Sequence, residues 1–176
     1  MATIESLTDA EFAAGPTLCT GWAPRDVLAH VIGTDQPVPY LRRGLRIDRV
    51  NADMTEQSRA LTRAALQAAG RKWATEPTTF GRFASVFLLL GDLGIHHQDV
   101  LRGLGRTREV PDAVAAAIFR EGAFLSLQKN RRILRHRVVP DAGRAVGRGP
   151  TVRGSREALG MWLAGRDAAT ADLVFA

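Results

Sequence analysis

Residues 18–32 read LCTGWAPRDVLAHVI, and this stretch indicates how the first part of the chain folds. Pro24 suits the first turn of a helix, because the N–H that proline lacks would have no intrahelical partner there. Asp26 in the same turn complements the positive end of the helix dipole. Apolar residues then recur at helical spacing and predict one buried face: Val27, Leu28, Val31 and Ile32.

The same spacing continues through most of the chain and predicts a mainly α fold. Helices are expected over residues 8–14, 24–32, 51–74, 79–104 and 111–130, and after Ser155. Residues 133–153 are instead rich in Gly and Val, and strands at 137–139 and 150–153 predict a small β-hairpin. We therefore expect a helical domain over residues 1–130 and a short α/β extension over 131–176 that packs on it.

Length and composition describe an ordinary globular protein. The chain has 176 residues, of which 45% are hydrophobic and 24% charged, which is enough apolar content for a core. Neither a run of about 20 apolar residues nor a basic, apolar leader is present, so we expect a cytoplasmic protein without membrane contact. Cys19 is the single cysteine, which excludes an intramolecular disulfide.

The formal net charge of +6 leaves two classes of partner open. Arginine neutralises nucleic-acid phosphates, but its planar guanidinium equally binds the carboxylates of a small anionic substrate. The densest basic region, residues 131–148, contains no aromatic residue and no recognition motif for nucleic acid. This absence argues against the Arg-rich nucleic-acid binder and favours a small anionic molecule.

Asp92 and His96 form the pair with the clearest chemical meaning. They are four residues apart, so on a helix they share one face. A carboxylate directly after the apolar run 86–90 would be costly to bury alone, and a divalent metal would remove that cost. His30 is the candidate third ligand, and Asp99, one turn further on, could orient an imidazole. By spacing alone, a helix-surface pair or a buried Asp–His hydrogen bond explains the same residues.

Three segments together resemble the mycothiol-dependent maleylpyruvate isomerase family, within the DinB-like superfamily. Residues 18–30 resemble its motif Cys-Pro-Gly-Trp…Arg-Asp-Val-x-x-His, and residues 92–100 resemble its motif Glu-x-x-x-His-x-x-Asp. Residues 149–166 resemble the tail common in that family. The segments occur in the expected order and span nearly the whole chain.

The resemblance implies a DinB-like four-helix bundle that holds a divalent metal, with Zn²⁺ the expected ion. Its ligands would be His30, Asp92 and His96, with Asp99 and His97 in the surrounding shell. It also implies mycothiol as a cosubstrate, which a metal would activate for cis–trans isomerisation or thiol transfer. Arg153 and Arg166 are candidates for holding the substrate carboxylates, although solvated surface charges are the simpler interpretation.

The chain departs from the family pattern at several positions. Asp92 replaces the usual Glu, Thr20 replaces a Pro, and Ala23 replaces a capping Ser or Thr. Only about seven residues precede the Leu7–Ala14 segment, where the family has a long first helix. We expect the bundle to be completed by a second copy in a homodimer, by the tail, or by a longer natural start.

These departures keep a second hypothesis open, in which the chain is a non-catalytic helical module that binds metal or another protein. Two further residues have structural explanations from the sequence. Cys19 precedes a helix start, where a thiolate is favoured, but a small packing residue is the simpler interpretation. Trp22 is expected to anchor the core at the helix entry rather than to contact a ligand.

Overall fold

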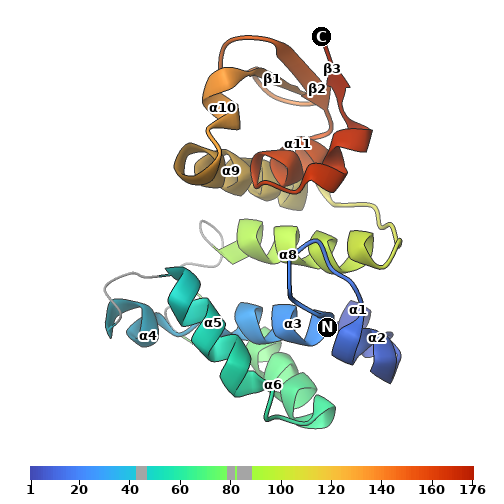
Figure 1. Ribbon diagram of the computed structural model, residues 1–176, viewed down its shortest axis with the longest axis vertical. Helices are drawn as coiled ribbons and strands as arrows, with labels where there is room; N and C mark the ends of the chain where they lie inside the picture. Colours follow the sequence, from blue (N-terminus) through green and yellow to red (C-terminus); the bar gives the residue numbers. More distant parts are fainter. Residues whose placement is uncertain (43–46, 79–81, 83–88) are drawn as a thin grey trace. The chain divides into compact units, whose positions relative to one another are not determined.

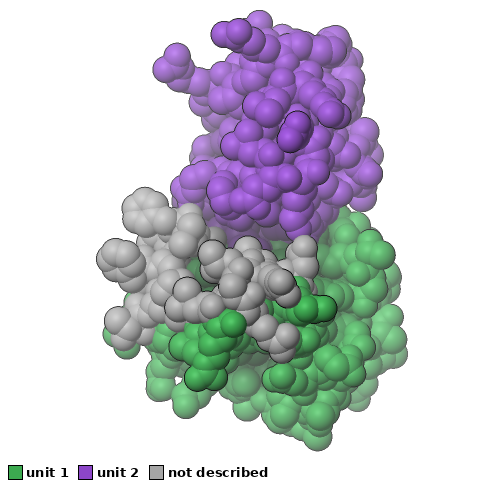
Figure 2. Space-filling view, turned by 60° about the vertical axis from the view of Figure 1, so that its left-hand side comes forward, with its two compact units in different colours: residues 1–89, 96–107 green, residues 90–95, 108–176 purple. Residues whose placement is uncertain are grey.

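The computed structural model describes residues 1–42, 47–78, 82 and 89–176. Contacts within the chain divide it into two compact units (Figure 2). The N-terminal unit comprises residues 1–89 and 96–107, and the C-terminal unit comprises residues 90–95 and 108–176. The described part is mainly helical with one three-stranded sheet, as the sequence predicts. No helix in the described ranges is both long and apolar enough to cross a membrane.

The N-terminal unit is built from short helices around an apolar cluster (Figure 1). Its elements are α1 (Ala2–Glu5), α2 (Asp9–Ala14), α3 (Pro24–Gly33), α4 (Pro37–Arg42), α5 (Ile47–Ser58), α6 (Arg63–Thr75) and the second half of α8 (Leu90–Gly103). The predicted capping box of α2 is present, since Thr8 and Glu11 exchange side-chain to backbone hydrogen bonds. The cluster joins α2, α3, α6 and α8 through buried residues such as Phe12, Leu28 and Val100.

The single long helix predicted over residues 51–74 is wrong, because the chain forms two helices there. Thr62 caps α6 by accepting a hydrogen bond from the backbone N–H of Ala65 at 3.2 Å. The guanidinium of Arg25 donates to the carbonyl oxygens of Ser58, Arg59 and Leu61. Those carbonyls lie at the end of α5 and in the following turn, so Arg25 replaces partners that a continuous helix would supply.

The predicted helix over 79–104 is described only in part, since residues 79–81 and 83–88 lie outside the described residues. Its described portion is α8, which ends at Gly103 and so agrees with the expected end of the helix. The expected domain boundary near residue 130 stays a prediction; by contacts within the chain, residues 90–95 and 108–176 form one unit. Helix α9 (Asp112–Lys129) belongs with α11 (Arg156–Leu163), and their backbones approach closely at Gly122 and Gly160.

The predicted β-hairpin is also wrong, although both strands exist. β1 (Arg137–Pro140) pairs in parallel with β2 (Thr151–Gly154), and β2 pairs antiparallel with β3 (Val174–Phe175). The chain turns twice between β1 and β2: it returns beside β1 at Val146 and then reverses at Gly147, whose φ is +77°. A pattern of alternating residues does not distinguish the two strand directions, so the second reversal was not predictable from it.

The rest of the C-terminal unit supports this sheet. α10 (Arg132–Arg135) precedes β1, and the 3₁₀-helix η2 (Asp167–Asp172) precedes β3. α11 lies against α9 and the strands β1 and β2 (Figure 1). Its residues Leu159, Met161 and Leu163 are fully buried. Ser155 caps α11 as predicted, accepting a hydrogen bond from the N–H of Ala158 at 3.0 Å.

Candidate metal centre

A tight turn before α3 positions the first group of candidate residues. The N–H of Trp22 donates to the carbonyl of Cys19 at 3.0 Å, and Gly21 between them has a φ of +78°. This arrangement has the character of a type II turn, whose third residue favours glycine. The hydroxyl of Thr17 donates to the carbonyl of Trp22 at 2.8 Å, which closes the loop on itself. The turn therefore holds Cys19 and Trp22 in a fixed relation to the start of α3.

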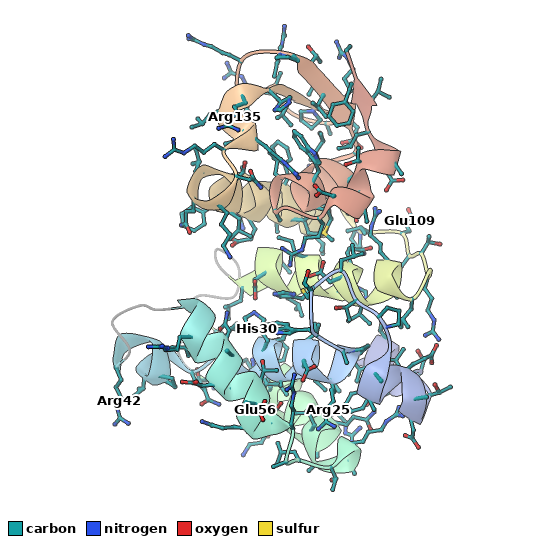
Figure 3. The ribbon with its side chains drawn as sticks, viewed as in Figure 1. Arg25, His30, Arg42, Glu56, Glu109 and Arg135 are labelled. Atoms are coloured by element: carbon teal, nitrogen blue, oxygen red, sulfur yellow. The ribbon has the colours of Figure 1, made fainter. Side chains whose placement is uncertain are left out.

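Helix α3 carries His30 in its last turn, in the middle of the N-terminal unit (Figure 3). The first turn of this helix is stabilised by Asp26, whose carboxylate accepts a hydrogen bond from the N–H of Ala23 at 3.0 Å. Asp26 also lies 3.4 Å from Nε of Arg59, and this hydrogen bond raises the pKa of Arg59. The side chain of His30 is buried. The prediction that residues 24–32 form a helix is confirmed, and Val27, Leu28 and Val31 are buried as expected. Ile32 is only partly buried, and burial is not limited to one face, because all residues from Asp26 to Val31 are buried.

Helix α8 carries Asp92, His96 and Asp99 at successive turns. Asp92 lies in the first turn, where a carboxylate interacts favourably with the helix dipole. His96 is buried, and Asp99 is completely buried, with 0% of its surface exposed. Nδ1 of His96 lies 3.0 Å from Oδ2 of Asp99. The carboxylate thus fixes the orientation of the imidazole ring.

The two buried imidazoles lie against each other and against an indole ring. The ring centres of His30 and His96 are 4.6 Å apart at an angle of 77°. The ring of Trp22 lies 5.1 Å from that of His30 and 6.0 Å from that of His96. Trp22 does pack on the apolar cluster, as predicted for a core anchor. It also covers the two histidines, a role that its position in the sequence did not indicate.

Two groups of donor atoms meet at His96. Single donor atoms of His30, Asp92 and His96 all lie within 4.8 Å of one another, and the same holds for Cys19, His96 and Asp99. The first group contains the three residues that the sequence resemblance implied as metal ligands. Asp92 reaches it because it lies one turn before His96 on the continuous helix α8.

The donor types of the first group suit a divalent metal. Two imidazoles and one carboxylate are ligands that Zn²⁺ accepts, and three protein ligands leave a coordination position for a further molecule. Nδ1 of His96 lies next to Asp99, which orients the imidazole ring within this group. Carboxylate–imidazole–metal arrangements of this kind are common around bound zinc. The residues present therefore fit a divalent metal.

The remaining predicted residues lie in other surroundings. A ring nitrogen of His97 lies 2.8 Å from the hydroxyl oxygen of Thr3 in α1, and His97 belongs to neither donor group. Arg153 and Arg166 belong to the C-terminal unit. Arg153 is exposed on β2, and the guanidinium of Arg166 donates to the carbonyl of Ala164 at 2.9 Å. Their role toward a substrate remains a prediction.

The structure assigns Cys19 a place that the sequence interpretation missed. Its Sγ lies 3.0 Å from Oδ2 of Asp99 and 3.5 Å from Nδ1 of His96, so it is more than a small packing residue. Spacing gave no signal for this contact, because 77 residues separate Cys19 from His96. The N–H of Leu18 donates to the carbonyl of Asp99 at 3.1 Å, and this long-range backbone bond brings the loop to α8.

An open pocket of about 570 Å³ adjoins this cysteine. Its lining includes Cys19, Trp22, Arg25, Asp26 and Arg59. Two guanidinium groups and one carboxylate give this lining a net positive charge. The pocket lies within the N-terminal unit, and Cys19 is part of its lining.

Comparison of the chain with protein-family models, curated proteins and solved structures gives no match. The resemblance to mycothiol-dependent maleylpyruvate isomerases therefore has only the sequence motifs behind it and stays a prediction. The two donor groups are observed independently of that resemblance.

Proposed function

We propose that this chain is a divalent-metal-dependent enzyme that uses a low-molecular-weight thiol, of the mycothiol type, on a small anionic substrate. Zn²⁺ is the metal we propose, bound by His30, Asp92 and His96. The observation that carries the proposal is the meeting of these three donor groups, two of them buried imidazoles. We further propose a DinB-like four-helix bundle as the scaffold, a homodimer that completes it, and a cytoplasmic location, where such thiols stay reduced.

The residues of the chain have separate tasks in this proposal. A bound divalent cation lowers the pKa of a coordinated thiol, so that the thiolate forms near neutral pH. Asp99, whose Oδ2 lies 3.0 Å from Nδ1 of His96, holds the ring in place and would favour the tautomer with its proton on Nδ1. The ring of Trp22 lies beside both imidazoles and packs on the apolar cluster, and so helps to keep the two rings in place. Arg25 and Arg59 supply positive charge to the pocket that an anionic substrate would enter.

The proposed reaction begins with addition of the thiolate to an activated double bond of the substrate. A carbon–sulfur bond forms, and the electron pair of the double bond moves to the activating carbonyl group. Rotation about the new single bond, followed by return of that electron pair and loss of the thiolate, gives the trans isomer. Protonation of the adduct at carbon instead gives a thiol-transfer product, with the proton coming from solvent.

The direct test uses maleylpyruvate as substrate and mycothiol as thiol, with protein loaded with Zn²⁺. We expect isomerisation that stops on addition of a chelator and is lost in H30Q and H96A. The matched control is H136A, which alters a histidine of the C-terminal unit outside both donor groups. Turnover of the Zn²⁺-loaded protein no faster than that of H96A would refute the proposal and favour a non-catalytic metal-binding module.

A further inference from the structure

The Nδ1 side of His96 carries a second set of donor atoms, which the proposed reaction does not use. Sγ of Cys19 lies 3.5 Å from Nδ1 of His96 and 3.0 Å from Oδ2 of Asp99, and Nδ1 lies 3.0 Å from the same oxygen. Sulfur, nitrogen and oxygen atoms thus form a small triangle. All three residues belong to the N-terminal unit.

The three side chains are held in this relation by backbone structure. Cys19 is fixed by the turn at Gly21 and by its N–H, which donates to the hydroxyl of Thr17 at 3.1 Å. The N–H of Leu18 joins this loop to the carbonyl of Asp99. His96 and Asp99 are three residues apart on α8, so they share one face of the helix. The triangle is therefore preorganised by a loop and a helix that hydrogen-bond to each other.

We propose that Cys19, His96 and Asp99 form a thiolate-containing site for a borderline divalent cation such as Zn²⁺. In tetrahedral zinc sites, ligand atoms are separated by about 3.3–3.6 Å, given metal–ligand bonds of about 2.0–2.3 Å. The observed separations of 3.0, 3.0 and 3.5 Å require an opening of only about half an ångström. The thiolate distinguishes this site from the first group, whose donors are nitrogen and oxygen only.

Binding at this site needs no oxidant or reductant. The thiol proton of Cys19, which is donated to Asp99 in the structure, leaves to solvent as the sulfur–metal bond forms. Cys19 is only partly buried and lies in the lining of the open pocket, so this side of the site is close to solvent. A fourth coordination position remains for water or for a molecule in that pocket.

The two sites compete because they share one imidazole. Neutral histidine has a single lone pair on its ring nitrogens, while the other nitrogen carries a proton. When Nδ1 is protonated and bonds to Asp99, only Nε2 can bind the metal beside His30 and Asp92. When the proton moves to Nε2, Nδ1 can bind the metal beside Cys19 and Asp99. The tautomer of His96 therefore selects which site is filled, and about one metal per chain binds at a time.

Co²⁺ distinguishes the two sites, because a cobalt–thiolate bond gives a charge-transfer absorption in the near ultraviolet that nitrogen and oxygen ligands do not. We expect the H30Q and D92A proteins to bind Co²⁺ with a stronger absorption per bound ion than the unmodified chain. C19S is expected to bind Co²⁺ without this absorption, and H96A to bind at neither site. Circular dichroism of each variant establishes that it is folded.

Alkylation of the Cys19 thiol gives a second, independent measurement of the site. Because Cys19 is the only cysteine, the rate of iodoacetamide labelling reports on this residue alone. In H30Q we expect saturating Zn²⁺ to slow labelling at least tenfold. Two results would overturn the inference. One is an equal labelling rate of H30Q with and without Zn²⁺. The other is Co²⁺ bound to H30Q without the thiolate absorption.

This inference shares His96 with the proposed function, but the two fail in different ways. Metal binding that requires His30 and Asp92 and never gives the thiolate absorption would leave the proposed function standing and remove the Cys19 site. Metal binding that always gives the absorption and does not depend on His30 or Asp92 would support the Cys19 site and remove the proposed nitrogen and oxygen site.

Discussion

Replacing Gly122 by alanine tests the packing of α9 on α11 directly. A Cβ at this position would lie 2.1 Å from the carbonyl oxygen of Gly160 and 2.8 Å from its carbonyl carbon. Carbon–oxygen contacts are normally about 3.3–3.6 Å, so the two helices would have to separate by about 1 Å. Neither helix can avoid the contact by rotating a side chain, because the obstructing atoms are backbone.

The expected loss of stability follows from the side chains that this separation would loosen. Ile118, Leu159 and Leu163 have none of their surface exposed, and a radial gap of 0.5–1 Å removes about a quarter to a half of each van der Waals contact. Overpacking of this kind costs about 1–3 kcal/mol, and backbone obstruction places it at the upper end. Alanine has a higher helix propensity than glycine, which reduces this loss of stability by about 1 kcal/mol. We expect a net loss of about 2 kcal/mol.

The matched control is G70A, which makes the same change at another buried position inside a helix. Its Cβ would meet Met1 Sδ at 3.0 Å and Leu28 Cδ1 at 3.2 Å, and both are ends of flexible side chains. Urea denaturation followed by circular dichroism should show G70A within about 1 kcal/mol of the unmodified chain. A G122A protein as stable as G70A would refute the described close approach of α9 and α11.

Three further predictions concern single side chains. D99N should weaken Zn²⁺ binding about 10- to 100-fold in calorimetric titration, because the amide no longer holds His96 as a carboxylate does. S155A should lower the free energy of unfolding by about 1 kcal/mol, since the N–H of Ala158 loses its partner. Hydrogen bonds from Thr8, with Arg106 nearby, lower the pKa of Glu11, so its stabilising effect is complete above its ordinary pKa and is lost as pH falls through the lowered value. E11Q should therefore flatten the acid dependence of amide-exchange protection in residues 8–14.

Helix positions were predictable where local signals agree. The capping box at Thr8 and Glu11, Pro24 at the start of α3 and Ser155 before α11 each mark a helix that the structure contains. The break between α5 and α6 was not predicted, although Thr62 is itself a capping residue. That break depends on Arg25, a residue 33 positions away from the first carbonyl it binds, and periodicity contains no information about such contacts.

The pairing of the strands and part of the candidate site also depend on contacts between residues far apart in the sequence, which the local pattern does not reveal. The parallel pairing of β1 and β2 depends on the return of the chain at Val146. At the site, the spacing of Asp92 and His96 was visible in the sequence, because both lie on one helix. The approach of Cys19 was not visible, because it depends on the bond between Leu18 and the backbone of Asp99.

The zinc content of the protein purified without chelators tests the central claim, which is that His96 is a ligand of a bound metal. We predict about one equivalent of Zn²⁺ per chain, since one neutral imidazole serves both donor groups. H96A should contain almost none, whereas H97A, which alters the neighbouring histidine beside Thr3, should keep the full amount. No zinc in the unmodified chain, or equal zinc in H96A and H97A, would contradict the account.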